Sequence, residues 1–202
     1  MSRPKRVRVA NFHYHIFART HNKKEYFRED WVKELYELIL KEAQDHFCFE
    51  LHNYVIMPNH VHLIIKPTRK KYPIDRIMQY IQSQFARRYN KQVGRRGAFW
   101  NERYGCKVAE LQKKPTEYLY RVNCYLWENP YNAGLVDCAE AYEHSGIHKY
   151  LDPRKKDIAG MILPNYFLEL GSSTQVRMRR ILCFKDSSIP IFFRHNKNID
   201  IY

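Results

Sequence analysis

A turn followed by an apolar strand, at residues 53–66, constrains this 202-residue chain more than any other segment. The sequence there reads NYVIMPNHVHLIIK, in which Pro58 and Asn59 are turn-forming residues between two apolar runs. Because side chains on a strand alternate between its two faces, His60 and His62 project from the same face. We therefore expect a β-hairpin that carries two neighbouring imidazoles, which are two of the ligands that a divalent-metal site needs.

The rest of the chain alternates between strand-like and helix-like segments. Alternating apolar residues predict strands at 12–19, 48–57 and 61–66 and a short β-like segment at 106–111. Helical periodicity predicts helices that begin at Asp30 as N-cap, at Pro73 in the first turn and near Pro115, and the last should end at Asn129 because Pro130 follows. The order strand, helix, hairpin, helix, strand, helix indicates an α+β sandwich, a mainly antiparallel sheet with helices packed on it.

The chain divides by composition near residue 150. Residues 1–150 carry the regular pattern and are expected to form one domain. The stretch DPRKK at 152–156 is typical of a linker, and the segment after it has weak periodicity and many basic residues, Arg194 among them. We therefore expect residues 151–202 to be a basic C-terminal extension to which the sequence assigns no role.

The charge of the chain points to a polyanionic partner. There are 35 Lys plus Arg against 21 Asp plus Glu, a formal net charge of +14, which favours nucleic acid first and an acidic membrane surface second. No stretch approaches the roughly 18 apolar residues of a membrane span, and no apolar signal core follows the basic start of the chain. The five cysteines include no C-x-x-C pair, so we expect reduced thiols and a cytoplasmic location.

A second candidate element lies on the third helix. Tyr125 and Asn129 are four residues apart and therefore share one helix face. A phenol can attack phosphorus, and an amide oxygen can complete a metal's ligand set. The chain has 16 tyrosines, however, and spacing alone favours a core or interface aromatic at any one of them. An isolated His-x-His is likewise as consistent with two structural histidines as with a metal site.

A run of basic residues mixed with aromatic ones lies between the second helix and the segment after it. Such a mixture suits single-stranded nucleic acid, since charges follow phosphates and rings stack on bases. The alternative is a solvated basic helix end whose aromatic rings pack in the core, and both descriptions can hold for different residues. The run comprises Arg87, Arg88, Tyr89, Lys91, Arg95, Arg96, Phe99 and Trp100.

Several other chemistries lack their residues. No phosphate-binding loop of the Gly-x-x-x-x-Gly-Lys-Ser/Thr type occurs, which makes ATP-driven work improbable. A histidine-triad hydrolase would need a third alternating histidine where Ile64 stands. A two-motif phosphodiesterase would need a second His-x-Ser/Thr, which His13 and His15 on the first strand do not supply.

Taken together, the motifs resemble the single-tyrosine HUH transposases, in which U is a hydrophobic residue. The run YVIMPNHVHL at 54–63 is similar to the family signature, and YHI at 14–16 with Arg19 is similar to the first strand. Residues 77–104 resemble the central helix and loop, and YLWENP at 125–130 with AGLV at 133–136 resembles the nucleophile helix. The matches occur in the family's order over roughly residues 12–150. The chain looks most similar to the REP-associated branch, which acts on repeated extragenic palindromes.

The resemblance implies a ferredoxin-like fold and a metal-dependent strand transfer on single-stranded DNA that contains a hairpin, such as a repeated extragenic palindrome. It implies Tyr125 as the nucleophile, His60, His62 and Asn129 as metal ligands, and Mg²⁺ or Mn²⁺ as the ion. It also implies a nucleoid-associated protein, with no membrane partner, that acts as a monomer or a homodimer. The residues expected to bind DNA are Arg19, Arg87, Arg88, Lys91, Arg95, Arg96 and Arg103.

Two other functions remain open at this stage. A ferredoxin-like sheet with a basic rim can bind single-stranded nucleic acid without any chemistry, in which case Tyr125 is a core residue and the histidines stack on bases. A metal-dependent phosphodiesterase that uses water would cut DNA without forming a protein adduct. The chain also departs from the family near residue 144, where His144 precedes Ser145 in place of a Trp-Ser pair, and we expect this to change local packing.

Overall fold

The strands and helices follow the expected order along the chain. A computed structural model describes residues 7–185, and residues 186–202 of the expected extension, with Arg194, lie outside this range. The elements are β1 (Tyr14–Arg19), α1 (Asp30–Phe47), β2 (Phe49–Met57), β3 (His60–Pro67), α2 (Ile74–Gln92), β4 (Gly105–Val108), α3 (Pro115–Asn132), α4 (Ile147–Leu151), α5 (Asn165–Leu168) and α6 (Thr174–Leu182).

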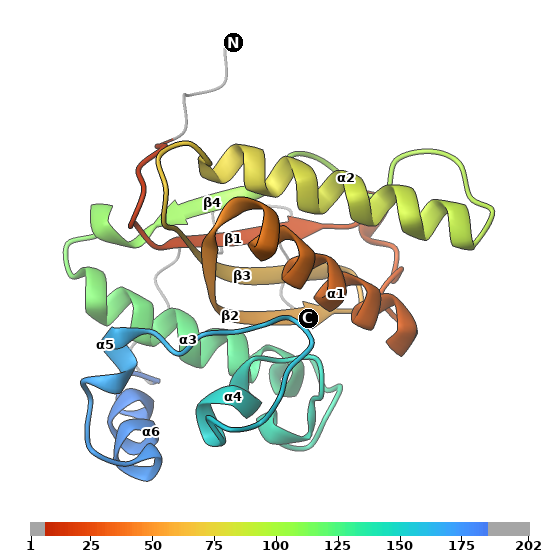
Figure 1. The fold of residues 1–202 in the computed structure, drawn as a ribbon. Coiled ribbons are helices and arrows are strands. Elements are labelled where there is room, and N and C mark those ends of the chain that lie inside the picture. The colour runs from red at the N-terminus through yellow and green to blue at the C-terminus, as the bar shows by residue number, and fades with distance from the viewer. Residues whose placement is uncertain (1–6, 186–202) are drawn as a thin grey trace.

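The four strands form one sheet in the order β2-β3-β1-β4, and every neighbouring pair is antiparallel. The helices α1 and α2 pack against each other on one face, and α3 lies on the other, as Figure 1 shows. This strand order, with a helix after β1 and another after β3, is the ferredoxin-like arrangement. The expectation of an α+β sandwich with a mainly antiparallel sheet is confirmed.

Both faces of the central strands are buried, which explains the continuous apolar run at 63–65 of β3. Val61, Leu63 and Ile65 face α1 and α2 and belong to the larger apolar cluster. Ile64 faces α3 and belongs to a second cluster. His62 follows the same alternation as Ile64 and therefore lies on the α3 face. The strand thus holds the imidazole rigidly, because packing on both sides of the sheet fixes its backbone.

A β-bulge at His52 interrupts the pairing of β2 with β3. The register steps from Leu51 opposite Ile65 to Asn53 opposite Ile64, so that His52 is the extra residue. Because of this extra residue, both His52 and Asn53 lie on the α3 face. Asn53 there donates to the side chain of Asn123 on α3 at 2.7 Å, which ties the helix to the sheet.

The helix α3 does not end at Asn129 as expected but runs on to Asn132, with Pro130 inside its last turn. A proline near a helix end removes only one backbone hydrogen bond. The helix stops at Gly134, whose φ of +67° is the left-handed conformation that glycine adopts most easily. Ala133 still bonds back to the carbonyl of Asn129 at 3.0 Å. The boundary prediction was therefore wrong by one turn.

Smaller differences concern other boundaries, and the three expected strands are each shifted by one or two residues at an end. Asp30 is the first residue of α1 and not its N-cap, and Pro73 is the N-cap of α2 and not a first-turn residue. The β-like segment at 106–111 divides into β4 and a single 3-10 turn over Ala109–Leu111. None of these shifts changes the order of the elements.

The described part of the C-terminal extension packs closely on α3. Phe167 and Ile181 are fully buried and belong to the same apolar cluster as the sheet. The hydroxyl of Tyr166 is 2.9 Å from the amide of Asn123 on α3, and the hydroxyl of Tyr120 donates to the carbonyl of Tyr166 at 3.1 Å. Beyond the surface turn at 152–156, the chain therefore supports the helix that carries Tyr125.

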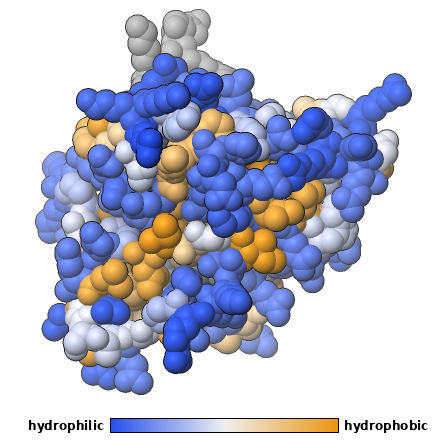
Figure 2. Space-filling model, in the orientation of Figure 1, coloured by the Kyte–Doolittle hydropathy of each residue, from blue (hydrophilic) through white to orange (hydrophobic). Residues whose placement is uncertain are grey.

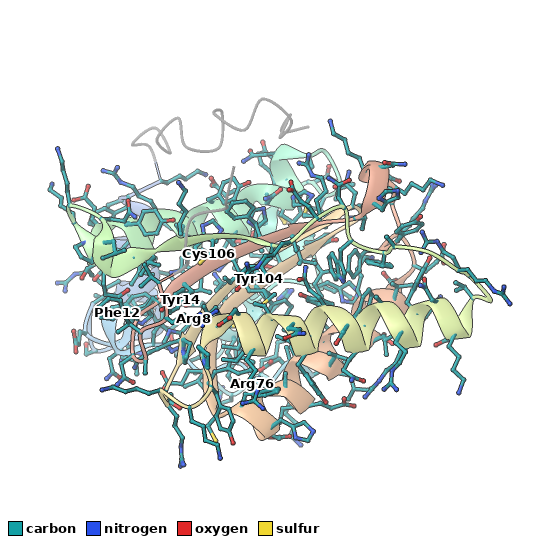
Figure 3. The ribbon with its side chains drawn as sticks, turned by 90° about the horizontal axis from the view of Figure 1, so that it is seen from above. Arg8, Phe12, Tyr14, Arg76, Tyr104 and Cys106 are labelled. Carbon is teal, nitrogen blue, oxygen red and sulfur yellow. The ribbon has the colours of Figure 1, made fainter. Side chains whose placement is uncertain are left out.

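The segment before β1 is held at the first turn of α2. Figure 3 shows Arg8 and Tyr14 near that end of the helix. Arg8 pairs with Asp75 at 2.7 Å, and the hydroxyl of Tyr14 donates to the carbonyl of Val9 at 2.9 Å.

Within residues 7–185, no helix combines the length and apolar character needed to cross a bilayer.

Candidate active site

The turn at Pro58 and Asn59 delivers two histidines to one end of the sheet. The centroids of the His60 and His62 rings are 5.2 Å apart, with the ring planes at 89°. His60 lies opposite Arg19 of β1, and His62 lies opposite Phe17. The structure therefore confirms that the two imidazoles lie side by side on one face of a strand.

Hydrogen bonds at Nδ1 set the orientation of both rings. Nδ1 of His60 is 2.6 Å from Oδ1 of Asn59, an acceptor, so Nδ1 carries the proton. Nδ1 of His62 is 3.1 Å from Nε2 of His15. Because both rings use Nδ1 within the protein, a metal would bind them through Nε2.

Burial keeps both imidazoles in the form that binds metals. Burial first, and the charge of Arg19 second, lower the pKa of His60 to about 3. Burial, followed by the neighbouring His60 and His15, holds the pKa of His62 well below its ordinary value. Neutral imidazole is the ligand form of histidine, so the environment of both side chains fits a metal site.

Tyr125 reaches these histidines from α3. The helix presents the stripe Tyr118, Val122, Tyr125 and Asn129 to the sheet, at spacings of three and four residues. The ring of Tyr125 meets His62 edge-on, with centroids 5.3 Å apart and an interplanar angle of 89°. Burial raises the pKa of Tyr125 to about 12, while Asn129 and Arg19 act in the opposite direction. The phenol is therefore protonated at neutral pH.

Asn129 lies one helical turn beyond Tyr125 and is 6% exposed. A hydrogen bond from its side chain to the Tyr125 hydroxyl acts against the effect of burial on the pKa of that phenol. The amide therefore lies within reach of the phenol, and its Oδ1 is the atom that an ion would bind.

A metal held by His60 and His62 would need a further protein ligand, and Asn129 is the residue that the family resemblance assigns to this role. Within residues 7–185, no group of three or more His, Cys, Asp or Glu side chains could hold an ion. Two imidazoles and one amide oxygen are a donor set that Mg²⁺ or Mn²⁺ accepts, although imidazole also suits Zn²⁺. We name His60, His62, Tyr125 and Asn129 the histidine–tyrosine site.

The basic residues expected at the DNA interface fall into two groups. Arg19 of β1 lies beside the histidine–tyrosine site, opposite His60, and its charge acts on the pKa of His60, His62 and Tyr125. The second group follows the C-terminal end of α2 and the loop after it. A bridge between Thr20 and Trp100 ties this loop to the end of β1 that carries Arg19. Exposed side chains in this group are Arg87, Lys91, Arg96 and Arg103.

Two members of the second group already have partners inside the protein. Arg88 makes a bidentate pair with Glu42 of α1, at 2.9 and 2.6 Å. Arg95 lies over the ring of Tyr26, 4.6 Å from its centroid, and bonds to the carbonyl of Ala98 at 2.8 Å. A phosphate contact by either side chain would have to compete with these interactions.

The aromatic residues of the basic run belong to the core. Phe99 is 1% exposed and Tyr89 is 8% exposed. Nε1 of Trp100 donates to the carbonyl of Gln82 at 3.0 Å. The sequence left open whether these rings stack on nucleic-acid bases or pack in the core, and the structure shows that they pack in the core.

Figure 2 shows that hydrophilic residues cover most of the face in view, with apolar patches across its middle.

His144, where the chain departs from the family pattern, lies away from the histidine–tyrosine site. Its Nδ1 is 3.1 Å from Glu37 of α1, and its carbonyl accepts from the backbone of Ile56 at 3.1 Å. It lines a cavity of about 290 Å³ together with Tyr54 and Lys149, among others, and no residue of the histidine–tyrosine site lines that cavity. The departure thus affects the edge of β2 and not the site.

Sequence reasoning missed His15. Strand alternation places it on the face opposite Tyr14, but its closeness to His62 depends on the register of β1 with β3. In that register His15 lies opposite Ile64, which makes it the diagonal neighbour of His62. Only the pairing of the strands could have revealed this contact.

Comparison with known protein families matches residues 8–125 to the family described as "Transposase IS200 like", which covers more than half of the chain. The chain belongs to the IS200-like transposase family. This confirms the resemblance drawn from the motifs. Tyr125 is the last residue of the matched region, and Asn129 lies beyond it.

Two relatives of this transposase-family chain are informative. A protein of Haemophilus influenzae named "Putative REP-associated tyrosine transposase" is 22% identical over 129 residues, which are 59% of this chain and 70% of that protein. A solved structure of a REP-associated tyrosine transposase bound to a REP hairpin has a TM-score of 0.62 at 18% identity, and covers 79% of this chain and 90% of that one. At this identity the solved structure establishes the fold.

Proposed function

We propose that this protein is a metal-dependent transesterase that cuts and rejoins single-stranded DNA containing a hairpin, through a 5′-phosphotyrosine intermediate. The observation that carries the proposal is the arrangement of the histidine–tyrosine site. The phenol of Tyr125 on α3 meets the imidazole of His62 edge-on, and His60 lies beside His62 on the same strand. The buried amide of Asn129 lies one turn further along the same helix. This arrangement supports the phenol of Tyr125 as the nucleophile.

The reaction exchanges one phosphoester for another. The Tyr125 oxygen attacks the scissile phosphorus, the new P–O bond to the phenol forms, and the bond to the 3′ oxygen breaks. The phenolic proton is given up, and the departing 3′ oxygen ends as a hydroxyl. A second 3′-hydroxyl can reverse these steps and reseal a strand without ATP, which agrees with the missing phosphate-binding loop.

His60, His62 and Asn129 would hold Mg²⁺ or Mn²⁺. When bound, the ion would polarise the scissile phosphate and offset the charge that develops on it. The protein itself orients both imidazoles through Nδ1, excludes water from the buried phenol, and places Arg19 where its charge favours the phenolate. Because the nucleophile is held on a packed helix, less entropy is lost when its oxygen is brought in line with the scissile bond.

The substrate class rests on charge and on the relatives. The solved relative is bound to a REP hairpin, and this chain carries a net charge of +14. We infer that the exposed basic residues of α2 and its loop contact the DNA backbone beside the histidine–tyrosine site. Acting on DNA, the protein would be cytoplasmic and nucleoid-associated, as a monomer or a homodimer.

Separating cleavage from binding tests the proposal. Hairpin-containing single strands from beside the gene are incubated with Mg²⁺, with Mn²⁺ or with a chelator. We expect cleavage by the wild type only with metal, and no cleavage by His60→Ala. The same variant should keep its DNA affinity within a few-fold, because the basic surface is untouched.

The outcomes distinguish the competing functions. Equal loss of binding and cleavage in His60→Ala would contradict the assignment of separate roles. Binding by the wild type without cleavage, on several flanking hairpins and with either metal, would favour a non-catalytic binding module. Cleavage that never yields a protein–DNA adduct would favour a phosphodiesterase that uses water.

A further inference from the structure

A third histidine stands behind the histidine–tyrosine site. His15 is fully buried on the α3 face of β1. Its Nε2 is 3.1 Å from Nδ1 of His62, and the ring centroids are 5.3 Å apart with the ring planes at 29°. Its other nitrogen, Nδ1, is 3.3 Å from the hydroxyl of Tyr118 on α3. Both nitrogens of His15 therefore face a polar partner, one on β3 and one on α3.

The proton positions along this chain of contacts depend on one another. A metal bond through Nε2 of His62 requires the ring proton of His62 to sit on Nδ1. That proton is then donated to Nε2 of His15, which must act as the acceptor. A neutral His15 consequently carries its own proton on Nδ1, where it donates to the Tyr118 oxygen. A neutral imidazole has one donor and one acceptor nitrogen, and a phenol oxygen can accept, so His62, His15 and Tyr118 can form both hydrogen bonds at once.

We propose that His15, anchored by Tyr118, is a positioning residue that fixes the tautomer and ring orientation of His62 for metal binding. The inference rests on the proposed metal-dependent function and adds to it a residue that touches neither substrate nor metal. It also links two elements, because Tyr118 and Tyr125 lie on the same face of α3 two turns apart. The hydrogen-bonded chain therefore couples the metal-binding strand to the nucleophile helix.

The alternative is that His15 is simply a core histidine whose hydrogen bonds are satisfied. Apolar residues surround this part of the interface, including Val55, Ile64 and Val122. If packing alone mattered, leucine would serve at position 15, since replacing buried polar partners by apolar groups is often nearly neutral in stability. Metal affinity separates the two cases, because it depends on the orientation of His62 and not on packing as such.

The test compares His15→Leu with His15→Gln. Glutamine retains an oxygen that can accept from Nδ1 of His62, whereas leucine cannot. Mn²⁺ affinity is measured by calorimetry on the DNA-free protein, which needs no catalysis. We expect His15→Leu to weaken Mn²⁺ binding roughly 10–100-fold, the usual effect of losing such a supporting hydrogen bond. We expect His15→Gln to recover most of the affinity, and Tyr118→Phe to show a smaller loss.

Two controls keep the result interpretable. His52→Leu removes another buried histidine from the same face, where its ring contacts His13 and Tyr166 but not the site, and should leave Mn²⁺ affinity unchanged. Hairpin binding in chelator should be the same for every variant. If His15→Leu fails to fold, the comparison of His15→Gln with Tyr118→Phe still tests the proposal.

The inference and the proposed function can fail separately. Unchanged Mn²⁺ affinity in His15→Leu, or in both remaining variants if that one does not fold, would overturn the positioning role. Tight Mn²⁺ binding by a wild type that never cleaves hairpin DNA would refute the transesterase while leaving the role of His15 intact. A wild type that binds no Mn²⁺ would refute both.

Discussion

At the scale of single residues, the roles of the polar side chains on the α3 face follow from their neighbours. Tyr125 is one of 16 tyrosines, and its edge-on contact with His62 is what supports a role for it beyond packing. The sequence could predict that His60 and His62 share one face of a strand and that Tyr125 and Asn129 share one face of a helix, because strand and helix periodicities fix these relations. The contacts of His15 could not, because they depend on which residues face each other across two strands far apart in sequence.

Glu50 gives a prediction about acid stability. Its carboxylate is 2.9 Å from Nε2 of His52 and 3.3 Å from Nζ of Lys66. The hydrogen bond with His52, aided by Lys66, lowers the pKa of Glu50 to about 2 in the folded protein. Since the folded pKa lies below that of the unfolded chain, about 4.3, this contribution to stability is full above pH 4.3 and is lost as the pH falls toward 2.

Urea unfolding at pH 6 and pH 3 measures this effect. We expect the free energy of unfolding to fall less between these pH values in Glu50→Gln than in the wild type, because glutamine does not titrate. The difference between them reports on Glu50 together with His52, because Glu50 also raises the pKa of His52 against the effect of burial. An identical fall in both proteins would contradict the assignment.

At the scale of elements, the support of α3 decides how precisely Tyr125 is placed. The sequence predicted the existence and order of the main elements well, since their apolar residues recur at clear intervals. It misplaced the end of α3 because a proline in the last turn is tolerated when Gly134 makes the actual stop. It gave no role to α6 because that helix is short and its few buried residues, such as Ile181, do not form a visible period.

The packing of α6 on α3 leads to a second prediction. Ile181 is fully buried, and its carbonyl lies 3.5 Å from Sγ of Cys124 on α3. Ile181→Ala should lower the free energy of unfolding by about 2–4 kcal/mol, the usual cost of removing a buried isoleucine side chain. The adjacent Leu182 is 42% exposed, and Leu182→Ala should change stability by less than about 0.5 kcal/mol.

Denaturant titrations of both variants would show whether the extension belongs to the cooperative unit. Equal, small effects of the two substitutions would mean that α6 contributes little to the stability of the core. Rates of cleavage at temperatures where both variants are folded would then show whether α6 still influences Tyr125.

At the scale of the whole molecule, net charge and its distribution govern the encounter with DNA. The excess of basic residues predicted a nucleic-acid partner from composition alone, and membership of a transposase family agrees with it. Composition could not show which basic side chains are free of protein partners and exposed enough to contact DNA phosphates. Arg88 is held by Glu42, whereas Arg96 is exposed in the loop after α2.

Salt dependence tests this distinction. The affinity for hairpin DNA should fall steeply and linearly on logarithmic axes as salt rises, because bound cations are released from the phosphates. Arg96→Ala should reduce the slope by about 1. Arg88→Ala should reduce it less, since Arg88 already pairs with a carboxylate. A flat salt response in the wild type would argue against phosphate contacts altogether.

The central claim is that Tyr125 becomes covalently linked to DNA. Because the phenol would hold the 5′ phosphate of the downstream strand, a hairpin substrate labelled at its 3′ end should yield a labelled protein band on a denaturing gel. We expect this band with Mn²⁺, none with chelator, and none for Tyr125→Phe. Tyr131→Phe, which alters an exposed tyrosine on the same helix, should give the band at wild-type level. A band that persists in Tyr125→Phe, or cleavage without any band in the wild type, would contradict a covalent role for Tyr125.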